Sequence, residues 1–357
     1  MTLDEAAFLE GLLAIPSVSG EEEALAEHLA EQMAGLGYRV RRDAVGNVVG
    51  ELGEPDAERT ILLLGHMDTV PGRIPVRRAD GCLYGRGAVD AKGPLAAFVL
   101  AAGRAAAKLS GSRLLVVGAV EEEAHSRGAH HVAEVMPPPD GVIIGEPGGW
   151  EGITLGYKGS LSVDYRLARP TGHGAGARIP PAEEAVAFWN RLVVHTSEEN
   201  GDRRPPRFDT LDPTLRSIET ETDGLEDRIV MSVGLRLPLT VDVEALKHRM
   251  VAWSGDADVA FPYHEPPFRA EKNTPVVRAL LRSIRAVGGR PRFKLKTGTS
   301  DMNVVGPAWD CPIVAYGPGD SSLDHTPHEC IRLDAFRRAV DVLAKALGDL
   351  GRAQPEP

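Results

Sequence analysis

The chain has 357 residues, of which 43% are hydrophobic and 25% charged, and its formal net charge is −11. This composition is that of a globular protein with a sizeable core, and the length predicts one main domain plus a smaller one. The acidic balance argues against nucleic acid or an anionic membrane surface as the main partner, because both favour a basic face.

The sequence shows no sign of a membrane or a secreted location. The amino-terminal stretch is acidic before its apolar residues, where a secretory signal would be basic. The most apolar helix candidate carries Arg104 and Lys108, so it is too short to span a membrane. Cys82, Cys311 and Cys330 match no zinc or redox spacing. We therefore expect a cytoplasmic protein whose cysteines serve in packing.

The first 150 residues alternate between strand-like and helix-like segments. Ser19 and Glu22 match a capping box, which predicts that a helix begins there. Buried, non-alternating strands interleaved with helices predict an α/β domain, with a mostly parallel sheet sandwiched between helices. The expected strands are 38–42, 47–52, 60–65, 113–120 and 141–146, and the expected helices after the first are 93–109 and 127–136.

The pattern changes after Trp150, where residues 153–168 alternate apolar and polar side chains as a half-buried strand does. We interpret this region as an inserted two-layer α+β domain, with residues 1–152 and 266–357 forming the main domain and 153–265 the insertion. The expected elements are strand 153–168, helix 181–199, loop 200–213, strand 228–237, helix 243–253 and strand 257–263, then helix 276–287, strands 292–297 and 312–317, and helix 333–347.

Polar, titratable residues follow several of the expected strands. Ligands of a parallel α/β sheet collect beyond the carboxyl ends of its strands, so these residues are expected to share one edge. Each motif alone has an ordinary interpretation as a turn histidine, a helix cap or a solvated acidic face. Their joint placement favours a site. The residues are His66 and Asp68, Asp90 in a glycine-rich loop, Glu121 to Glu123, Glu146 and His325.

Imidazoles and carboxylates without a thiolate suit Zn²⁺ or a similar ion. The candidate ligands outnumber the three protein ligands of an ordinary catalytic zinc, and a shared carboxylate can bridge two ions about 3.5–4 Å apart. A site for two metal ions is therefore the better match. The candidate ligands are His66, Asp90, Glu123, Glu146 and His325.

The motifs GHMDTVP, GRGAVDAKG, EEE, GEP and DHTPHE occur in this order over nearly the whole chain. They resemble the co-catalytic zinc family of desuccinylases, N-acyl-ornithine deacetylases and glutamate-releasing carboxypeptidases. The stretches EPGGWEGITLGYKGS and KTGTSDMNVV are most similar to the branch that releases lysine or ornithine from an amino-group carrier protein. The resemblance implies a zinc-peptidase-like catalytic domain with an inserted lid and dimerisation domain.

The resemblance also implies the metal ligands. His66 and Glu146 would hold one zinc, and Glu123 and His325 would hold the other. Asp90 would bridge the two ions. Cobalt is expected to be able to substitute for zinc.

The resemblance implies catalytic roles for three further residues. Asp68 would fix the tautomer of the metal-binding imidazole two residues before it. Glu122 would be the general base, although the run of three glutamates leaves a register with Glu121 as base open. His173 resembles a lid histidine that reaches across a dimer interface to the oxyanion, so a homodimer is expected.

Substrate contacts are implied more weakly. Lys158 and Arg236 occupy places where relatives carry basic contacts, and Thr299 lies in a loop that resembles a carboxylate-binding one. The lid loop departs from the pattern of the family at residues 227–230. The basic stretches 203–207 and 292–296 have two interpretations, as solvated charges or as a docking surface for an acidic carrier protein.

Three functions follow from these observations. The first is a di-zinc amidohydrolase that frees lysine or ornithine from the terminal glutamate of an amino-group carrier protein, in lysine and arginine biosynthesis. The second is a deacylase of free N-acetylornithine, N-acetyl-lysine or succinyl-diaminopimelate. The third, from another class, is a metal-loaded protein that binds the carrier without turnover.

Overall fold

The computed structural model describes residues 4–173, 178–201 and 206–352. The chain forms two compact units. The larger unit comprises residues 1–156, 269–295 and 300–357, and the smaller unit comprises 157–268 and 296–299. Among the described residues, no helix combines the length and the apolar character needed to cross a membrane.

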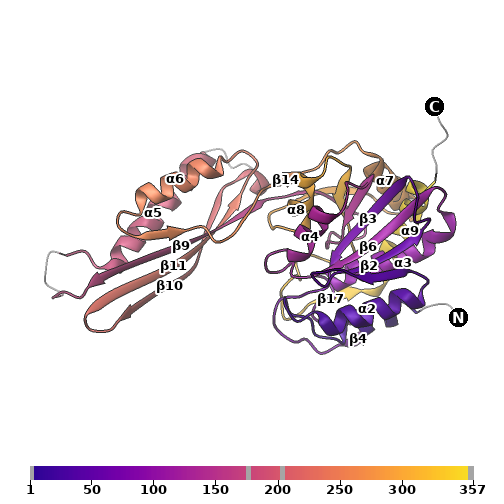
Figure 1. Ribbon diagram of the computed structural model, residues 1–357, viewed down its shortest axis with the longest axis horizontal. Coiled ribbons are helices and arrows are strands. Elements are labelled where there is room, and N and C mark those ends of the chain that lie inside the picture. Colours follow the sequence, from indigo (N-terminus) through magenta and orange to yellow (C-terminus); the bar gives the residue numbers. More distant parts are fainter. Residues whose placement is uncertain (1–3, 174–177, 202–205, 353–357) are drawn as a thin grey trace. The chain divides into compact units, whose positions relative to one another are not determined.

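A mixed sheet forms the centre of the larger unit (Figure 1). Its four central strands are parallel, and antiparallel strands flank them on both sides. The prediction of an α/β fold with a largely parallel core is therefore confirmed. The order is β1 (Arg39–Arg42), β2 (Val48–Gly53), β6 (Ser112–Ala119), β3 (Arg59–His66), β7 (Gly141–Ile144), β16 (Ile313–Ala315), β8 (Gly152–Tyr157) and β14 (Phe268–Arg269), with β15 (Arg292–Lys296) also paired to β8.

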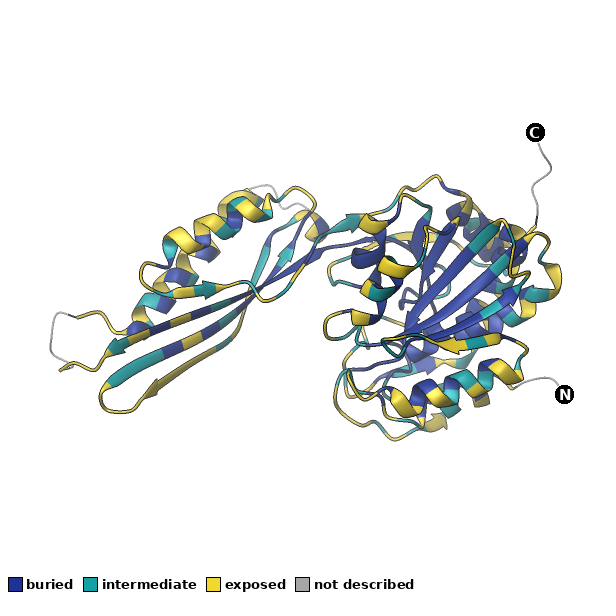
Figure 2. Ribbon diagram, in the orientation of Figure 1, coloured by how far each residue is buried: buried dark blue, intermediate teal, exposed yellow. Residues whose placement is uncertain are grey.

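The central strands are buried on both faces, as Figure 2 shows. Successive side chains of a strand point to opposite faces. In β3, Ile61 and Leu63 join the main core with the helices, and Leu62 and Leu64 on the other face are fully buried as well. The helices of this unit are α1 (Glu5–Leu13), α2 (Glu23–Gly35), α3 (Lys92–Ala105), α4 (Arg127–Val135), α7 (Pro275–Ala286), α8 (Asp301–Ala308) and α9 (Leu333–Leu350).

Two short elements complete the larger unit. A 3-10 turn, Ala106–Lys108, extends α3. A small antiparallel sheet joins β17 (Cys330–Arg332), β5 (Cys82–Tyr84) and β4 (Arg77–Ala79), so it links the segment after His325 to the segment before Asp90. This sheet brings two distant parts of the sequence together next to the site described below.

The smaller unit has two layers, an antiparallel sheet and a pair of helices with their own core. The sheet order leaves the outer edge of β10 unpaired within the described residues. The strands are β10 (Asp212–Thr222), β11 (Glu226–Leu237), β9 (Gly159–Pro170), β12 (Asp258–Ala260) and β13 (His264–Glu265), and the helices are α5 (Pro181–Asn200) and α6 (Val243–Trp253), with a 3-10 turn at Arg207–Asp209.

Three local predictions are wrong. The expected strand 153–168 is two strands, β8 and β9, which are separated at Lys158. The expected loop 200–213 runs into β10, which begins at Asp212. The expected capping box is absent, because the Ser19 hydroxyl donates to Asp68 and the N-cap of α2 is Glu22 without a side-chain cap. A contact distant in sequence thus replaces the local one.

Candidate metal centre

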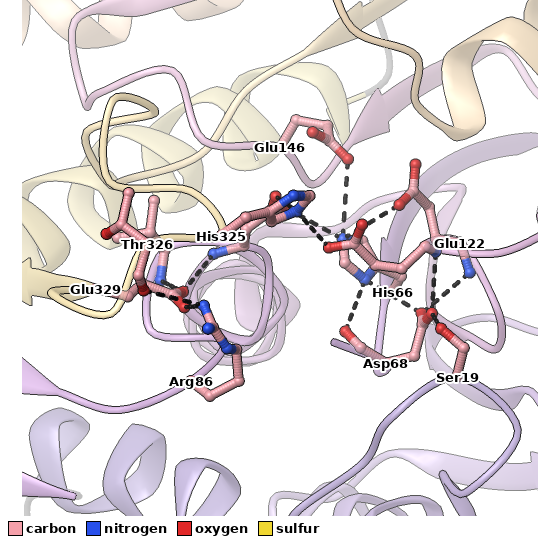
Figure 3. Close-up of polar contacts among 12 residues, drawn as sticks. Ser19, His66, Asp68, Arg86, Glu122, Glu146, His325, Thr326 and Glu329 are labelled. Atoms are coloured by element: carbon pink, nitrogen blue, oxygen red, sulfur yellow. Dashed lines mark hydrogen bonds and ion pairs between the residues drawn. The ribbon is translucent and has the colours of Figure 1, made fainter. Parts of the chain in front are cut away.

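The carboxyl ends of the central strands bring the acidic and histidine residues together. Strands β6, β3, β7 and β16 lie side by side in that order and run parallel. His66 is the last residue of β3, Glu122 follows β6, and Glu146 follows β7. His325 follows β16 in the chain, and its imidazole points into the same cluster (Figure 3).

His66 is oriented so that one ring nitrogen faces the carboxylates. Its side chain is 1% exposed, and Nδ1 lies 3.0 Å from the backbone oxygen of Asp68 and 3.3 Å from Asp68 Oδ1. On the other side, Nε2 lies 3.4 Å from Asp90 Oδ1 and 4.0 Å from Glu146 Oε1. Within the described part of the chain, Nε2 is buried without a hydrogen bond. A proton on Nδ1 leaves the Nε2 lone pair free for a cation.

A second group of ligand atoms surrounds His325. Its Nε2 lies 2.8 Å from Glu123 Oε1 and 3.1 Å from Asp90 Oδ2. Asp90 therefore belongs to both groups, through one carboxylate oxygen each. In each of the two groups, His66 with Asp90 and Glu146 and then Asp90 with Glu123 and His325, the ligand atoms lie within 4.8 Å of one another.

Asp68 organises the loop that carries the glutamates. Its carboxylate, fully buried, accepts hydrogen bonds from the backbone N–H groups of Glu122 and Glu123, each at 3.0 Å, and from the Ser19 hydroxyl at 2.7 Å. Glu121 instead pairs with Arg127 at 2.7 Å. The structure thus places the carboxylates of Glu122 and Glu123, rather than that of Glu121, in the cluster.

The cluster attracts positive charge. Burial lowers the pKa of His66, but its contacts with Asp68 and Asp90 outweigh this and raise the pKa well above its ordinary value. Hydrogen bonds with Asp90 and Glu123 raise the pKa of His325 to about 10. Despite its burial, these two imidazoles hold the pKa of Asp90 well below its ordinary value. The clustered carboxylates favour a positive charge between them, and imidazole and carboxylate groups are common ligands of divalent cations.

Glu122 lies beside both groups without belonging to either. Its Oε2 is 3.9 Å from His66 Nε2. Burial, together with the charges of Glu146 and Asp301, raises the pKa of Glu122 well above its ordinary value. A buried carboxylate with a raised pKa next to a metal site is suited to accept and return a proton.

Three residues of the larger unit that the sequence analysis did not assign to the site also belong to this region. Asp301 is 2% exposed, and burial raises its pKa to about 7. Ser19 holds Asp68, and Glu329 accepts a hydrogen bond from the Asp90 backbone N–H at 3.1 Å. The sequence contained one signal for them, because Asp301 and Glu329 lie within motifs that had been assigned other roles.

The remaining predicted residues belong to the smaller unit. His173 is exposed. The Arg236 guanidinium donates to Thr299 Oγ1 at 3.3 Å. Lys158 is fully buried, and its ammonium donates to Asp212 at 2.6 Å, to the Arg207 carbonyl and to Thr210. Lys158 therefore ties the start of β9 to the segment that leads into β10.

An acid and histidine cluster at the carboxyl edge of an α/β sheet, with a buried carboxylate beside it, is an arrangement suited to a metal-dependent hydrolase. The model of peptidase family M20/M25/M40 matches residues 62–349 of this chain, which belongs to that family.

Relatives agree with this assignment. A LysW-lysine hydrolase of Deinococcus radiodurans is 43% identical over 343 residues, which cover 94% of this chain and 94% of the relative. A putative LysW-lysine/LysW-ornithine hydrolase of Thermococcus kodakarensis is 38% identical and covers 97% of this chain and 92% of its own length. The M20 metallo-carboxypeptidase Sso-CP2 of Sulfolobus solfataricus shares the fold, with a TM-score of 0.80, 20% identity, and 98% and 100% of the two chains covered.

Proposed function

We propose that this protein is a two-zinc amidohydrolase that releases lysine, ornithine or both amino acids from the terminal glutamate of an amino-group carrier protein. The bond cleaved is the amide between the side-chain carboxyl of that glutamate and the α-amino group of the released amino acid. The names of the relatives, at 43% and 38% identity over almost the whole chain, support this substrate. The observation that best supports a site for two metal ions is that Asp90 belongs to both candidate ligand groups.

In this proposal His66 and Glu146 would hold one zinc, Glu123 and His325 would hold the other, and Asp90 would serve both. The orphaned Nε2 of His66 and the excess of carboxylates support the assignment. Cobalt takes the same nitrogen and oxygen ligands and is proposed to substitute. When bound, the metal ions would polarise the amide carbonyl and lower the pKa of water towards about 7.

Glu122 is the proposed general base. It takes a proton from the attacking water as the oxygen bonds to the amide carbon. It then returns this proton to the amino nitrogen as the carbon–nitrogen bond breaks, which leaves a carboxylic acid on the carrier and a free amine. The second proton of the water passes from this carboxylic acid to the amine, so that the carrier regains a carboxylate and the amino acid leaves with an ammonium group. Asp68 supports both steps, because it holds the Glu122 backbone N–H and the His66 ring.

We further propose a homodimer in which His173 of one subunit stabilises the oxyanion in the site of its partner. Two features of the smaller unit support association. The outer edge of β10 has no partner strand among the described residues, and such edges commonly pair with another chain. On α5, Val186 and Val194 are 46% and 55% exposed, which leaves an apolar helix face uncovered.

Arg236 and Thr299 are the proposed substrate contacts, and their mutual hydrogen bond supports a joint role. Lys158 was also expected to contact substrate. Its ammonium is saturated by acceptors from residues 207–212, so its proposed contribution is to hold that segment in place.

An acidic carrier requires basic residues on the surface that it contacts, and Arg292 of the larger unit and Arg207 of the smaller unit, each exposed, are two separate candidates. Arg203 and Arg204 of the same stretch lie outside the described residues. Such a surface would chiefly raise the association rate and make it dependent on salt. We propose that the enzyme works in the cytoplasm with this carrier.

The proposal is tested by measuring lysine release from carrier-linked lysine beside free N-acetyl-lysine, N-acetylornithine and succinyl-diaminopimelate. Strong preference for the carrier supports the proposal. Equal or better turnover of a free substrate would make the protein a small-molecule deacylase. Carrier binding without turnover of any substrate would instead support the non-catalytic alternative.

A further inference from the structure

Glu329 is a fully buried carboxylate that binds the backbone of a proposed metal ligand. It is 0% exposed, and its Oε1 accepts hydrogen bonds from the N–H groups of Val89 at 2.9 Å and Asp90 at 3.1 Å. A buried carboxylate needs compensating donors or charges. Here the donors come from the loop whose side chain, Asp90, belongs to both ligand groups.

The other oxygen of Glu329 is connected to the His325 turn through Arg86. Oε2 accepts from Arg86 at 2.8 Å, and Arg86 also donates to the carbonyl oxygen of Thr326 at 3.3 Å (Figure 3). A further hydrogen bond joins Arg86 to the carbonyl oxygen of Gly72 at 3.1 Å. Thr326 directly follows His325, whose φ of 59° lies in the left-handed region that non-glycine residues adopt only at an energetic cost. The Arg86 contact stabilises the turn in which that backbone conformation occurs.

We infer that Glu329 is a positioning residue: together with Arg86 it fixes the Asp90 loop and the His325 turn relative to each other, and so sets the distance between the two proposed ligands. The inference rests on the proposed metal-binding roles of those two residues. It is not a general packing effect, because the contacts go to the amide of one ligand residue and to the residue after the other. Outer partners of this kind typically change metal affinity about 10- to 100-fold when lost.

Glu329→Gln is the direct test. Glutamine keeps one acceptor for the Val89 and Asp90 N–H groups, but its amide nitrogen then faces the Arg86 guanidinium, donor against donor. We expect zinc affinity, measured by competition with a chromophoric chelator, to fall about 10- to 100-fold. Because Asp90 belongs to both groups, the affinity for each of the two zinc ions should fall. The visible absorption of the cobalt-substituted protein should also change. In the activity assay, kcat should fall by a larger factor than the factor by which KM changes.

Two further variants keep the test informative. Arg86→Gln removes the same ion pair by changing its other partner, Arg86, which lines a cavity of about 380 Å³. If Glu329→Gln fails to fold, this variant should still show a lower zinc affinity. Tyr38→Phe is the control, because it removes one buried hydrogen bond, to the Val99 carbonyl at 2.5 Å, and should leave zinc affinity unchanged.

The outcomes separate this inference from the proposed function. If the wild-type protein binds no zinc, both fail together. If the wild type binds zinc tightly and folded Glu329→Gln or Arg86→Gln matches its affinity and its cobalt spectrum, the positioning role alone is overturned.

Discussion

The substitution Asp68→Asn should separate the organisation of the metal centre from the stability of the fold. Asp68 accepts hydrogen bonds from the Glu123 N–H at 3.0 Å and the Ser19 hydroxyl at 2.7 Å through one oxygen, and from the Glu122 N–H at 3.0 Å through the other. An amide nitrogen in place of either oxygen meets a backbone N–H. The Ser19 hydroxyl can accept a hydrogen bond instead of donating one, but a backbone N–H can only donate.

The magnitude follows from that count. One buried backbone donor loses its acceptor, which costs about 1–3 kcal/mol in the free energy of unfolding. Removal of one negative charge from the acidic cluster offsets part of this cost. Zinc affinity should fall about 10- to 100-fold, because the imidazole and the glutamate loop lose their common support.

The assay pairs denaturant unfolding of the metal-free protein with zinc titration against a chelator. Asp140→Asn is the matched control, because its carboxylate accepts one backbone N–H, that of Thr60, at 2.7 Å, just before β7 and hence at the opposite end of the sheet. The control should leave zinc affinity unchanged. Wild-type zinc affinity and turnover in folded Asp68→Asn would refute the reasoning.

Other predictions follow from the same contacts. Ser19→Ala should lower the free energy of unfolding by about 1.5 kcal/mol, measured with denaturant, because one hydrogen bond to a charged group is lost. Chelation should lower the melting temperature in calorimetry, since zinc at a thousand times its Kd stabilises by about 4 kcal/mol, and an unchanged melting temperature would contradict the metal site. Val194→Asp should convert the proposed dimer to a monomer in analytical ultracentrifugation and remove most turnover; an active monomer would argue against the role of His173. Arg292→Glu should slow carrier association and reduce its dependence on salt, with turnover of small amides unchanged.

The fold was predictable where burial dominates. Segments such as 60–65 are continuous apolar runs, and they form the parallel strands at the centre of the sheet. Strand β10 was missed because its residues are mostly exposed, so it carries no apolar alternation. Helix α8 was missed because Gly306 and Pro307, which disfavour a helix, lie within it. Ser300 and Asn303 nevertheless form a capping box at its start.

The candidate site was predictable only in part. Its residues at strand ends follow from the sheet itself, since parallel strands bring their carboxyl ends to one edge. Residues in the surrounding loops do not. Ser19 matched a local capping pattern, yet its hydroxyl donates to a residue 49 positions away, and Glu329 contacts an amide 239 positions away. Such contacts depend on the tertiary fold, which local patterns do not specify.

The most direct test of the central claim compares lysine release by wild-type enzyme and Glu122→Gln, using carrier-linked lysine and protein of measured zinc content. The account predicts two zinc equivalents in both proteins, equal carrier binding, and release that is slower in the variant by about 10²- to 10⁴-fold, the usual contribution of a general base. Release at the wild-type rate by the zinc-loaded variant would contradict it.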